Sequence, residues 1–322
     1  MSERIVVVGY GACGRATVEA LIRRNRGTVA VAQRTRPTDL PQTIEFRPCD
    51  VLDPGAVQQA LFGATQVVLS IGLPYDSRVW RTAWPRAMTN VVEACAATGA
   101  RLVFIDNLYM MGPQREPLRE DMALSDYGAK PAIRSEVTRI WMAAASAGRA
   151  RITALRPPDF YGPGVGLSHL GTSTFGALAK GKPAFLIAPP DTPHDFAYVP
   201  DIGRAVVTLL EAPDDAFGRA WNMPCAPTRT PREILRLGAE ALGVKLRIRT
   251  VPLSLLPVLG LVSPFLREVA EMRFTFDRPY EVDASQFKRR FWSDVTPFDI
   301  GAPATARSFP ADAPSAQSVA LA

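Results

Sequence analysis

The first fifteen residues constrain the fold of this chain more than any other segment. An apolar run at 5–8 opens into a glycine-rich turn at 9–15, and apolar residues then recur at helical spacing. A strand, closely spaced glycines and a helix in this order predict a site for a dinucleotide pyrophosphate at the helix N-terminus. In such a turn Gly9 permits the bend, Gly11 lets the backbone approach the pyrophosphate, and Gly14 lets the helix lie against the strand. The residues predicted to bind the cofactor here are Gly9, Gly11, Ala12, Cys13, Gly14 and Arg15.

Strand and helix patterns alternate along the first half of the chain. Strands are predicted at 5–8, 28–32, 45–48, 66–70, 102–106 and 152–155, with helices near 14–25, 55–62, 78–98 and 132–147. This alternation is typical of βαβ units. It predicts an α/β fold of the Rossmann type, a doubly wound parallel sheet with a smaller C-terminal substrate lobe.

The pattern changes beyond residue 160, where loops rich in Gly and Pro separate helices expected near 201–211 and 231–242. Thr230 is the predicted N-cap of the second of these helices, with Pro231 at its first position. We expect three parts: an NAD(P)-binding core at 1–160, a mixed and discontinuous substrate lobe at 161–300 that partly returns to the core, and a flexible tail at 301–322.

Composition bounds the partners and the compartment. The chain carries 37 Lys and Arg residues against 31 Asp and Glu residues, but no basic run reaches five, so no nucleic-acid partner is expected. The apolar stretch 251–266 is broken by prolines and is shorter than the roughly 20 residues of a spanning helix. We expect an apolar lid or packing segment there and no membrane partner. Four widely spaced cysteines and an N-terminus without a signal-peptide pattern predict free thiols and a cytoplasmic location.

Two later segments are more specific than the glycines. Residues 155–164 read Leu-Arg-Pro-Pro-Asp-Phe-Tyr-Gly-Pro-Gly, and residues 196–201 read Phe-Ala-Tyr-Val-Pro-Asp. With the glycine turn, they make residues 4–245 resemble the extended short-chain dehydrogenase/reductase superfamily, which includes NAD-dependent epimerases and dehydratases acting on nucleotide sugars. The further cofactor-binding residues that this resemblance implies are Asp50 and Val51, beside the adenine, and Ser70 and Gly72, beside the ribose.

The catalytic part of the chain departs from that superfamily. Usual members carry Ser or Thr five residues before a Gly at the end of the fifth strand, where this chain has Asn107, and a Tyr and a Lys four residues apart on one helix. Tyr127 and Lys130 are three apart, and Pro131 can lie only in the first helical turn, which leaves Tyr127 in the preceding loop. The chain is therefore identified as an atypical member. An Asn carboxamide can orient a carbonyl but does not supply a proton, so Tyr109 is the first acid/base candidate and Tyr127 with Lys130 is the second.

The segment after the second predicted strand favours NADP over NAD. An NAD site of this kind places Asp or Glu near the strand end, where it binds the ribose hydroxyls. Residues 33–36 read Gln-Arg-Thr-Arg, and no acidic residue lies between Val29 and Thr38. The guanidinium groups of Arg34 and Arg36 suit a 2′-phosphate, and Arg15 adds a third positive charge.

The substrate is expected beyond the carboxyl ends of the strands, where ligands bind in open α/β sheets. Asp159, Tyr161 and His194 are predicted to line one cleft with Tyr109, whereas His169 is expected to face solvent or to be packed. These residues predict an NAD(P)-dependent oxidoreductase, epimerase or dehydratase acting on a small hydroxy or carbonyl compound such as a sugar derivative. The alternative is a non-catalytic NADP-binding sensor or regulatory protein. A homodimer is compatible with either function.

Overall fold

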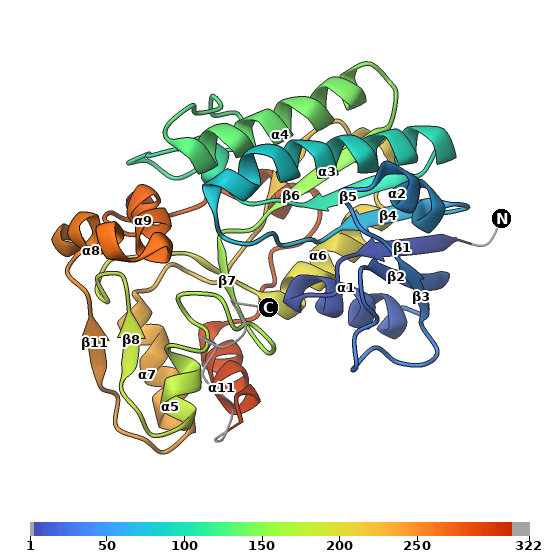
Figure 1. The fold of residues 1–322 in the computed structure, drawn as a ribbon. Helices are drawn as coiled ribbons and strands as arrows, with labels where there is room; N and C mark the ends of the chain where they lie inside the picture. Colours follow the sequence, from blue (N-terminus) through green and yellow to red (C-terminus); the bar gives the residue numbers. More distant parts are fainter. Residues whose placement is uncertain (1–2, 311–322) are drawn as a thin grey trace.

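The computed structural model describes residues 3–310, and a sheet of seven parallel strands forms its centre (Figure 1). The strand order is β10-β6-β5-β4-β1-β2-β3. The strands are β1 (Arg4–Val8), β2 (Thr28–Gln33), β3 (Glu45–Pro48), β4 (Gln66–Leu69), β5 (Arg101–Ile105), β6 (Arg151–Arg156) and β10 (Ala220–Asn222). The strand order reverses between β1 and β4, so the predicted Rossmann-type fold is confirmed.

Helices cover both faces of this sheet. α1 (Ala12–Arg23) and α6 (Val199–Glu211) pack on one face, while α2 (Pro54–Leu61), α3 (Ser77–Thr98) and α4 (Ala129–Ser146) pack on the other (Figure 1). Parallel strands buried on both faces need apolar side chains at almost every position, which explains the continuous apolar runs in the sequence.

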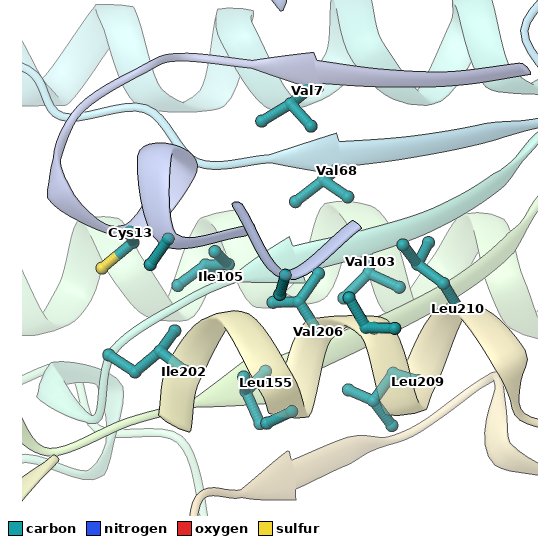
Figure 2. Packing of buried hydrophobic residues seen from close by; sticks show 14 of the residues in the cluster. Val7, Cys13, Val68, Val103, Ile105, Leu155, Ile202, Val206, Leu209 and Leu210 are labelled. Carbon is teal, nitrogen blue, oxygen red and sulfur yellow. The ribbon is translucent and has the colours of Figure 1, made fainter. Parts of the chain in front are cut away.

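Figure 2 shows how the sheet packs against α6. Val7, Val68 and Val103 come from three neighbouring strands and lie in one cluster with Ile202 and Val206 of the helix. Successive side chains of a strand point to opposite faces of the sheet. The residues before and after each of these valines on its own strand therefore pack on α2, α3 and α4. The core therefore lies in two layers on either side of the sheet and fixes the positions of the strand ends.

The second half of the chain is divided between the sheet and a smaller lobe. In the lobe β7 (Asp159–Tyr161) pairs with β9 (Phe196–Tyr198), and β8 (Ala184–Leu186) pairs with β11 (Ile248–Thr250). The other helices are α5 (Phe175–Ala179), α7 (Pro231–Ala241), α8 (Leu256–Val262), α9 (Pro264–Glu271), α10 (Ser285–Arg290) and α11 (Phe298–Ser308). Short 3₁₀ turns are η1 (Tyr109–Met111), η2 (Asp214–Ala216), η3 (Leu253–Leu255) and η4 (Arg273–Thr275).

Helix α7 begins as the sequence predicts. The Thr230 hydroxyl accepts a hydrogen bond from the Glu233 amide, and the Glu233 carboxylate accepts one from the Thr230 amide. Pro231 follows at the first helical position. This capping box satisfies two amide groups that the helix itself leaves without acceptors.

The prediction of a flexible tail from residue 301 is wrong for its first part. Residues 301–308 belong to α11, in which Ala302, Thr305 and Ala306 are fully buried. This helix packs on α7, where small side chains allow close approach. A composition of Ala, Ser and Pro therefore concealed a packing surface. Residues 311–322, the rest of the predicted tail, lie outside the described residues.

Within the part of the chain that the structure describes, no helix has the length and apolar character needed to cross a bilayer.

Candidate active site

The turn between β1 and α1 is built by two glycines that packing requires and one that it does not. Gly9 has a φ of 95°, and a Cβ there would overlap the carbonyl oxygen of Ser70. A Cβ on Gly14 would overlap the Gly9 carbonyl oxygen. A Cβ on Gly11 would meet no described atom within 4 Å. The space beside Gly11 is therefore open, as close approach of a ligand to the backbone requires.

Helix α1 directs its N-terminus at this open space. Gly11 is the N-cap and has no side chain to accept from the first amide groups, and the first turn contains no acidic residue. The first hydrogen bond of the helix runs from the Arg15 amide to the Gly11 carbonyl at 2.8 Å. Free amide donors and the positive end of the helix dipole suit a pyrophosphate. Burial raises the pKa of the Cys13 thiol to about 12, so this thiol is neutral beside the helix N-terminus.

The end of β2 carries the polar groups of the predicted adenosine end. Gln33 stands where an NAD site carries an acid, and its Oε1 accepts the Tyr10 amide at 3.0 Å. Arg34 is exposed and makes no hydrogen bond or ion pair within residues 3–310. Arg15 is not free, because it forms an ion pair with Asp39. The third positive charge predicted from Arg15 is therefore offset by Asp39, which the fold returns to this turn.

The other predicted cofactor residues lie at the same edge of the sheet. Asp50 follows β3 and accepts the Leu52 amide at 3.0 Å, and the Val51 carbonyl accepts the side chain of Asn90 at 2.9 Å. Ser70 and Gly72 follow β4, and a Cβ on Gly72 would meet no described atom within 4 Å. Arg36 lies 5.9 Å from the ring centroid of Phe46 on the neighbouring strand. The residues of this edge fit a dinucleotide lying across the strand ends.

Tyr109 lies beyond the carboxyl end of β5, beside residues that follow β4. Its ring is stacked on Trp80 at a centroid distance of 6.4 Å, and Tyr75 meets the same Trp80 edge-on at 5.6 Å. Burial raises the pKa of Tyr109, and the carboxylate of Asp159 raises it further. Asn107 accepts the Tyr109 amide on its Oδ1 at 3.1 Å. Tyr109 is therefore protonated at neutral pH, and Asn107 fixes the start of its turn.

Asp159, beyond the carboxyl end of β6, joins two histidines that are distant in sequence. His194 Nε2 lies 3.1 Å and His169 Nε2 lies 3.8 Å from Asp159 Oδ2. Burial acts to raise the pKa of Asp159, but the two imidazoles outweigh it and lower the net value. Burial lowers the pKa of His169, against the opposing effect of Asp159. The group thus combines an ionised carboxylate with an imidazole that stays neutral at neutral pH.

His194 is held by aromatic rings rather than exposed to a ligand. Its ring is stacked on Tyr280 at 4.8 Å and lies 4.5 Å from Phe196, and its side chain is only 4% exposed. His169 and Asp159 are the more accessible members, with side chains 23% and 24% exposed. A reacting group can therefore reach His169 and Asp159 more readily than His194.

Three residues around Tyr109, Asp159 and His194 were not predicted from the sequence as site residues. They are Tyr75, His169 and Tyr280. His169 lies in a loop rich in Gly and Ser, and nothing local indicates that the loop returns to the end of β6. Tyr280 lies in an aromatic-rich segment that reads as core packing. The only sequence signal for His169 is its rarity, because the chain has two histidines.

The prediction that Tyr161 lines the cleft is wrong. Its side chain is fully buried in the core of the C-terminal lobe, against Tyr198 and Phe298. In an ideal strand Tyr161 would share a face with Asp159, but Asp159 is only the first residue of the short β7. Tyr161 supports α11 instead, since a Cβ on Gly301 would overlap its hydroxyl.

Tyr127 and Lys130 do not come together as an acid/base pair. Tyr127 is 47% exposed and precedes α4, as the sequence predicts. Lys130 is fully buried, and its ammonium group pairs with Glu268 and, at 3.4 Å, with Glu271 of α9. The predicted catalytic role of this pair is therefore corrected: the charge of Lys130 holds α9 on the core.

A buried ion network supports the floor of the site. Asp106, which directly precedes Asn107, pairs with Arg134 and with Arg156 Nε at 3.4 Å. Both guanidinium groups are almost fully buried. This network fixes the ends of β5 and β6, after which Tyr109 and Asp159 emerge.

A doubly wound sheet whose carboxyl edge carries an open glycine turn and a cluster of Tyr109, Asp159 and two histidines is typical of dinucleotide-binding α/β proteins with a second lobe. A family model places the chain more narrowly: residues 5–223 match the NAD dependent epimerase/dehydratase family. The chain belongs to this family. No curated protein matches it.

Solved structures agree with this fold. UDP-glucose 4-epimerase from Thermus thermophilus, solved with NAD, is 20% identical with a TM-score of 0.76, and the match covers 95% of this chain and 98% of that one. UDP-glucuronic acid 4-epimerase from Bacillus cereus, also with NAD, is 16% identical with a TM-score of 0.77 and coverages of 95% and 96%. dTDP-glucose 4,6-dehydratase from Bacillus anthracis is 15% identical with a TM-score of 0.76 and coverages of 95% and 96%. At these identities the likeness shows the fold.

Proposed function

We propose that this protein is a nicotinamide-dependent oxidoreductase, epimerase or dehydratase acting on a small hydroxy or carbonyl compound, with a sugar derivative as the leading substrate class. The observation that carries the proposal is the assembly of Tyr109, Asp159 and His169 at the edge of the sheet that holds the open glycine turn. Groups whose environments push their pKa values apart are the usual partners in acid/base catalysis.

The dinucleotide would lie across Gly11, Ser70 and Gly72, and it supplies the hydride acceptor or donor when bound. Tyr109 is protonated at neutral pH, and a developing alkoxide is more basic than a phenolate, so Tyr109 is the proton donor to that alkoxide even though burial raises its pKa. His169 is neutral and partly exposed, so it accepts the hydroxyl proton that is released when the substrate gives its hydride to the dinucleotide, and Asp159, whose Oδ2 lies 3.8 Å from its Nε2, stabilises the resulting imidazolium. Asn107 already uses Oδ1 for the Tyr109 amide, which leaves its Nδ2 group as a donor to a substrate carbonyl.

Turnover of variants tests these roles once a substrate is found in a panel of aldehydes, ketones and nucleotide sugars followed by NADPH or NADH absorbance. We expect Tyr109→Phe and His169→Gln to lower kcat by about 10²-fold or more. Tyr127→Phe is the matched control and should retain near-full kcat, because its side chain is 47% exposed and its ring packs on Phe274. Full activity in both Tyr109→Phe and His169→Gln would refute the assignment.

We propose NADP as the preferred dinucleotide. Gln33 replaces the acid that binds ribose hydroxyls, and Arg34 is an exposed guanidinium without a protein partner in residues 3–310. The neighbours solved with NAD share only the fold at their low identity.

Calorimetric titration tests this preference. Arg34→Ala should weaken NADP binding by about 10-fold, near 1.4 kcal/mol, and leave NAD binding unchanged. Arg236→Ala is the control, because that residue lies on α7 in the other lobe. Equal binding of NAD and NADP to the unaltered chain would contradict the preference.

A sensor that binds the dinucleotide without turnover is the second candidate. The observation that favours it is the absence of an assembled tyrosine–lysine pair among the described residues, since Tyr127 is exposed and Lys130 is buried in ion pairs. Dinucleotide binding in the titrations, combined with no hydride transfer to any compound in the panel, would support the sensor and oppose the enzyme.

A homodimer and a cytoplasmic location remain proposals from the sequence. Sedimentation velocity across a concentration series measures the first, and cell fractionation measures the second. A single monomeric species at all concentrations would contradict the dimer.

A further inference from the structure

Helices α8 and α9 form a hairpin at the outer edge of the C-terminal lobe (Figure 1). This hairpin and the turn before it leave large apolar side chains in solvent. They are Leu255, Val258, Leu261, Val262 and Phe265, which are 48%, 63%, 84%, 82% and 53% exposed, and we name them the apolar patch. Single exposed apolar residues are ordinary, but a cluster of this kind marks an interaction surface.

The apolar patch is distinct from the side of the hairpin that packs on the C-terminal lobe. The inner side of the same hairpin is packed, because Leu256 and Val269 are buried with Ala188 and Phe276. A Cβ on Gly260 would meet the backbone of the facing helix at 3.1 Å, so the two helices are already in close contact. The outer side chains therefore project from a fixed support.

In the segment 241–276 the basic residues are exposed and the acidic residues face the interior. Its exposed charged residues within 241–276 are all basic: Lys245, Arg247, Arg249, Arg267 and Arg273. The two acids of the same stretch, Glu268 and Glu271, turn inward and pair with the buried Lys130. The segment thus presents apolar and positive groups to solvent, with the charge of Arg273 offset by Asp277 at 3.6 Å and the other four basic residues without a carboxylate partner among the described residues.

We propose that the apolar patch docks this protein on the surface of an anionic phospholipid bilayer. Interfacial helices bind in this way, with apolar side chains at the acyl boundary and Lys or Arg at the headgroups. The positive flank selects a negative surface, and the short helices lie on the bilayer without crossing it. This revises the expectation from the sequence that the chain has no membrane partner.

The docked surface would border the candidate active site. Phe265 of the patch lies 6.3 Å, between ring centroids, from Tyr75, which also contacts the Trp80 stacked on Tyr109. Docking does not depend on the proposed reaction, since it needs only the patch and its flanking charges.

Vesicle flotation of the full chain tests the proposal. We expect the chain to float with phosphatidylcholine vesicles containing about 30% phosphatidylglycerol and to float much less with phosphatidylcholine alone. Salt at about 0.5 M should weaken the binding. The double variant Leu261→Ser, Val262→Ser should reduce flotation by about 10-fold or more. Phe62→Ser and Leu167→Ser are matched controls, because these side chains are 79% and 87% exposed outside the patch.

Three results would overturn the proposal. The first is no flotation with the anionic vesicles, and the second is equal flotation of the unaltered chain and the patch variant. The third is self-association in sedimentation velocity that the patch variant abolishes, without flotation, which would assign the patch to a second copy. Circular dichroism and urea unfolding of each variant establish that the fold is intact, as expected for side chains exposed by 84% and 82%.

Discussion

Replacing Lys130 with Met should lower the free energy of unfolding by about 3–5 kcal/mol, the cost of leaving a buried charge without its partner. The Lys130 side chain is 0% exposed, and Glu268 and Glu271 beside it are 8% and 21% exposed. Without the ammonium group, two carboxylates share a site with little solvent. The magnitude follows from burial, because an exposed ion pair contributes only about 0–1 kcal/mol.

Urea unfolding followed by circular dichroism measures this difference. The matched control is Arg139→Met, which removes an ion pair with Asp126 whose side chains are 54% and 76% exposed. The double variant Lys130→Met, Glu268→Gln should recover part of the loss, because it removes one of the two carboxylates left unpaired. A loss in Lys130→Met no larger than that in Arg139→Met would refute the structural role assigned to Lys130.

Three further changes test other parts of the structure. Gly14→Ala should lower the free energy of unfolding by about 1–3 kcal/mol, because the added methyl group would overlap a backbone carbonyl oxygen. Gly11→Ala should keep the free energy of unfolding unchanged and weaken dinucleotide binding, because the space beside it is open. Equal stability of the two variants would contradict this expectation. The pKa of His169 is lower in the folded chain than in the unfolded chain, so the unfolded chain takes up the proton first and stability should fall as the pH drops below 6.5. The lowered pKa of Asp159 adds a further loss of stability below pH 3.8. An unchanged pH profile of stability in His169→Gln would contradict the effect of His169. Thr230→Ala should cost about 1 kcal/mol by removing the cap of α7, and no measurable loss in urea unfolding would show that the cap is dispensable.

Local sequence patterns predicted the core because its signals are short in range. The glycine turn, the alternating strands and helices, and the Thr230 cap each depend on residues within a few positions of one another. Pro131 likewise placed Tyr127 outside α4. These features follow from backbone sterics and from the amide groups that a helix leaves free, which act in any tertiary context.

Long-range packing determines which chemical groups meet. His169 reaches Asp159 through a loop without regular periodicity, Asp39 returns to neutralise Arg15, and Glu268 reaches Lys130 across 138 positions of the chain. Each contact depends on the packing of separate elements, and no local pattern records the partner. Local sequence patterns are therefore enough to predict the sheet, its glycine turn and the position of its strand ends. The charge state and the neighbours of the side chains gathered there depend on long-range packing.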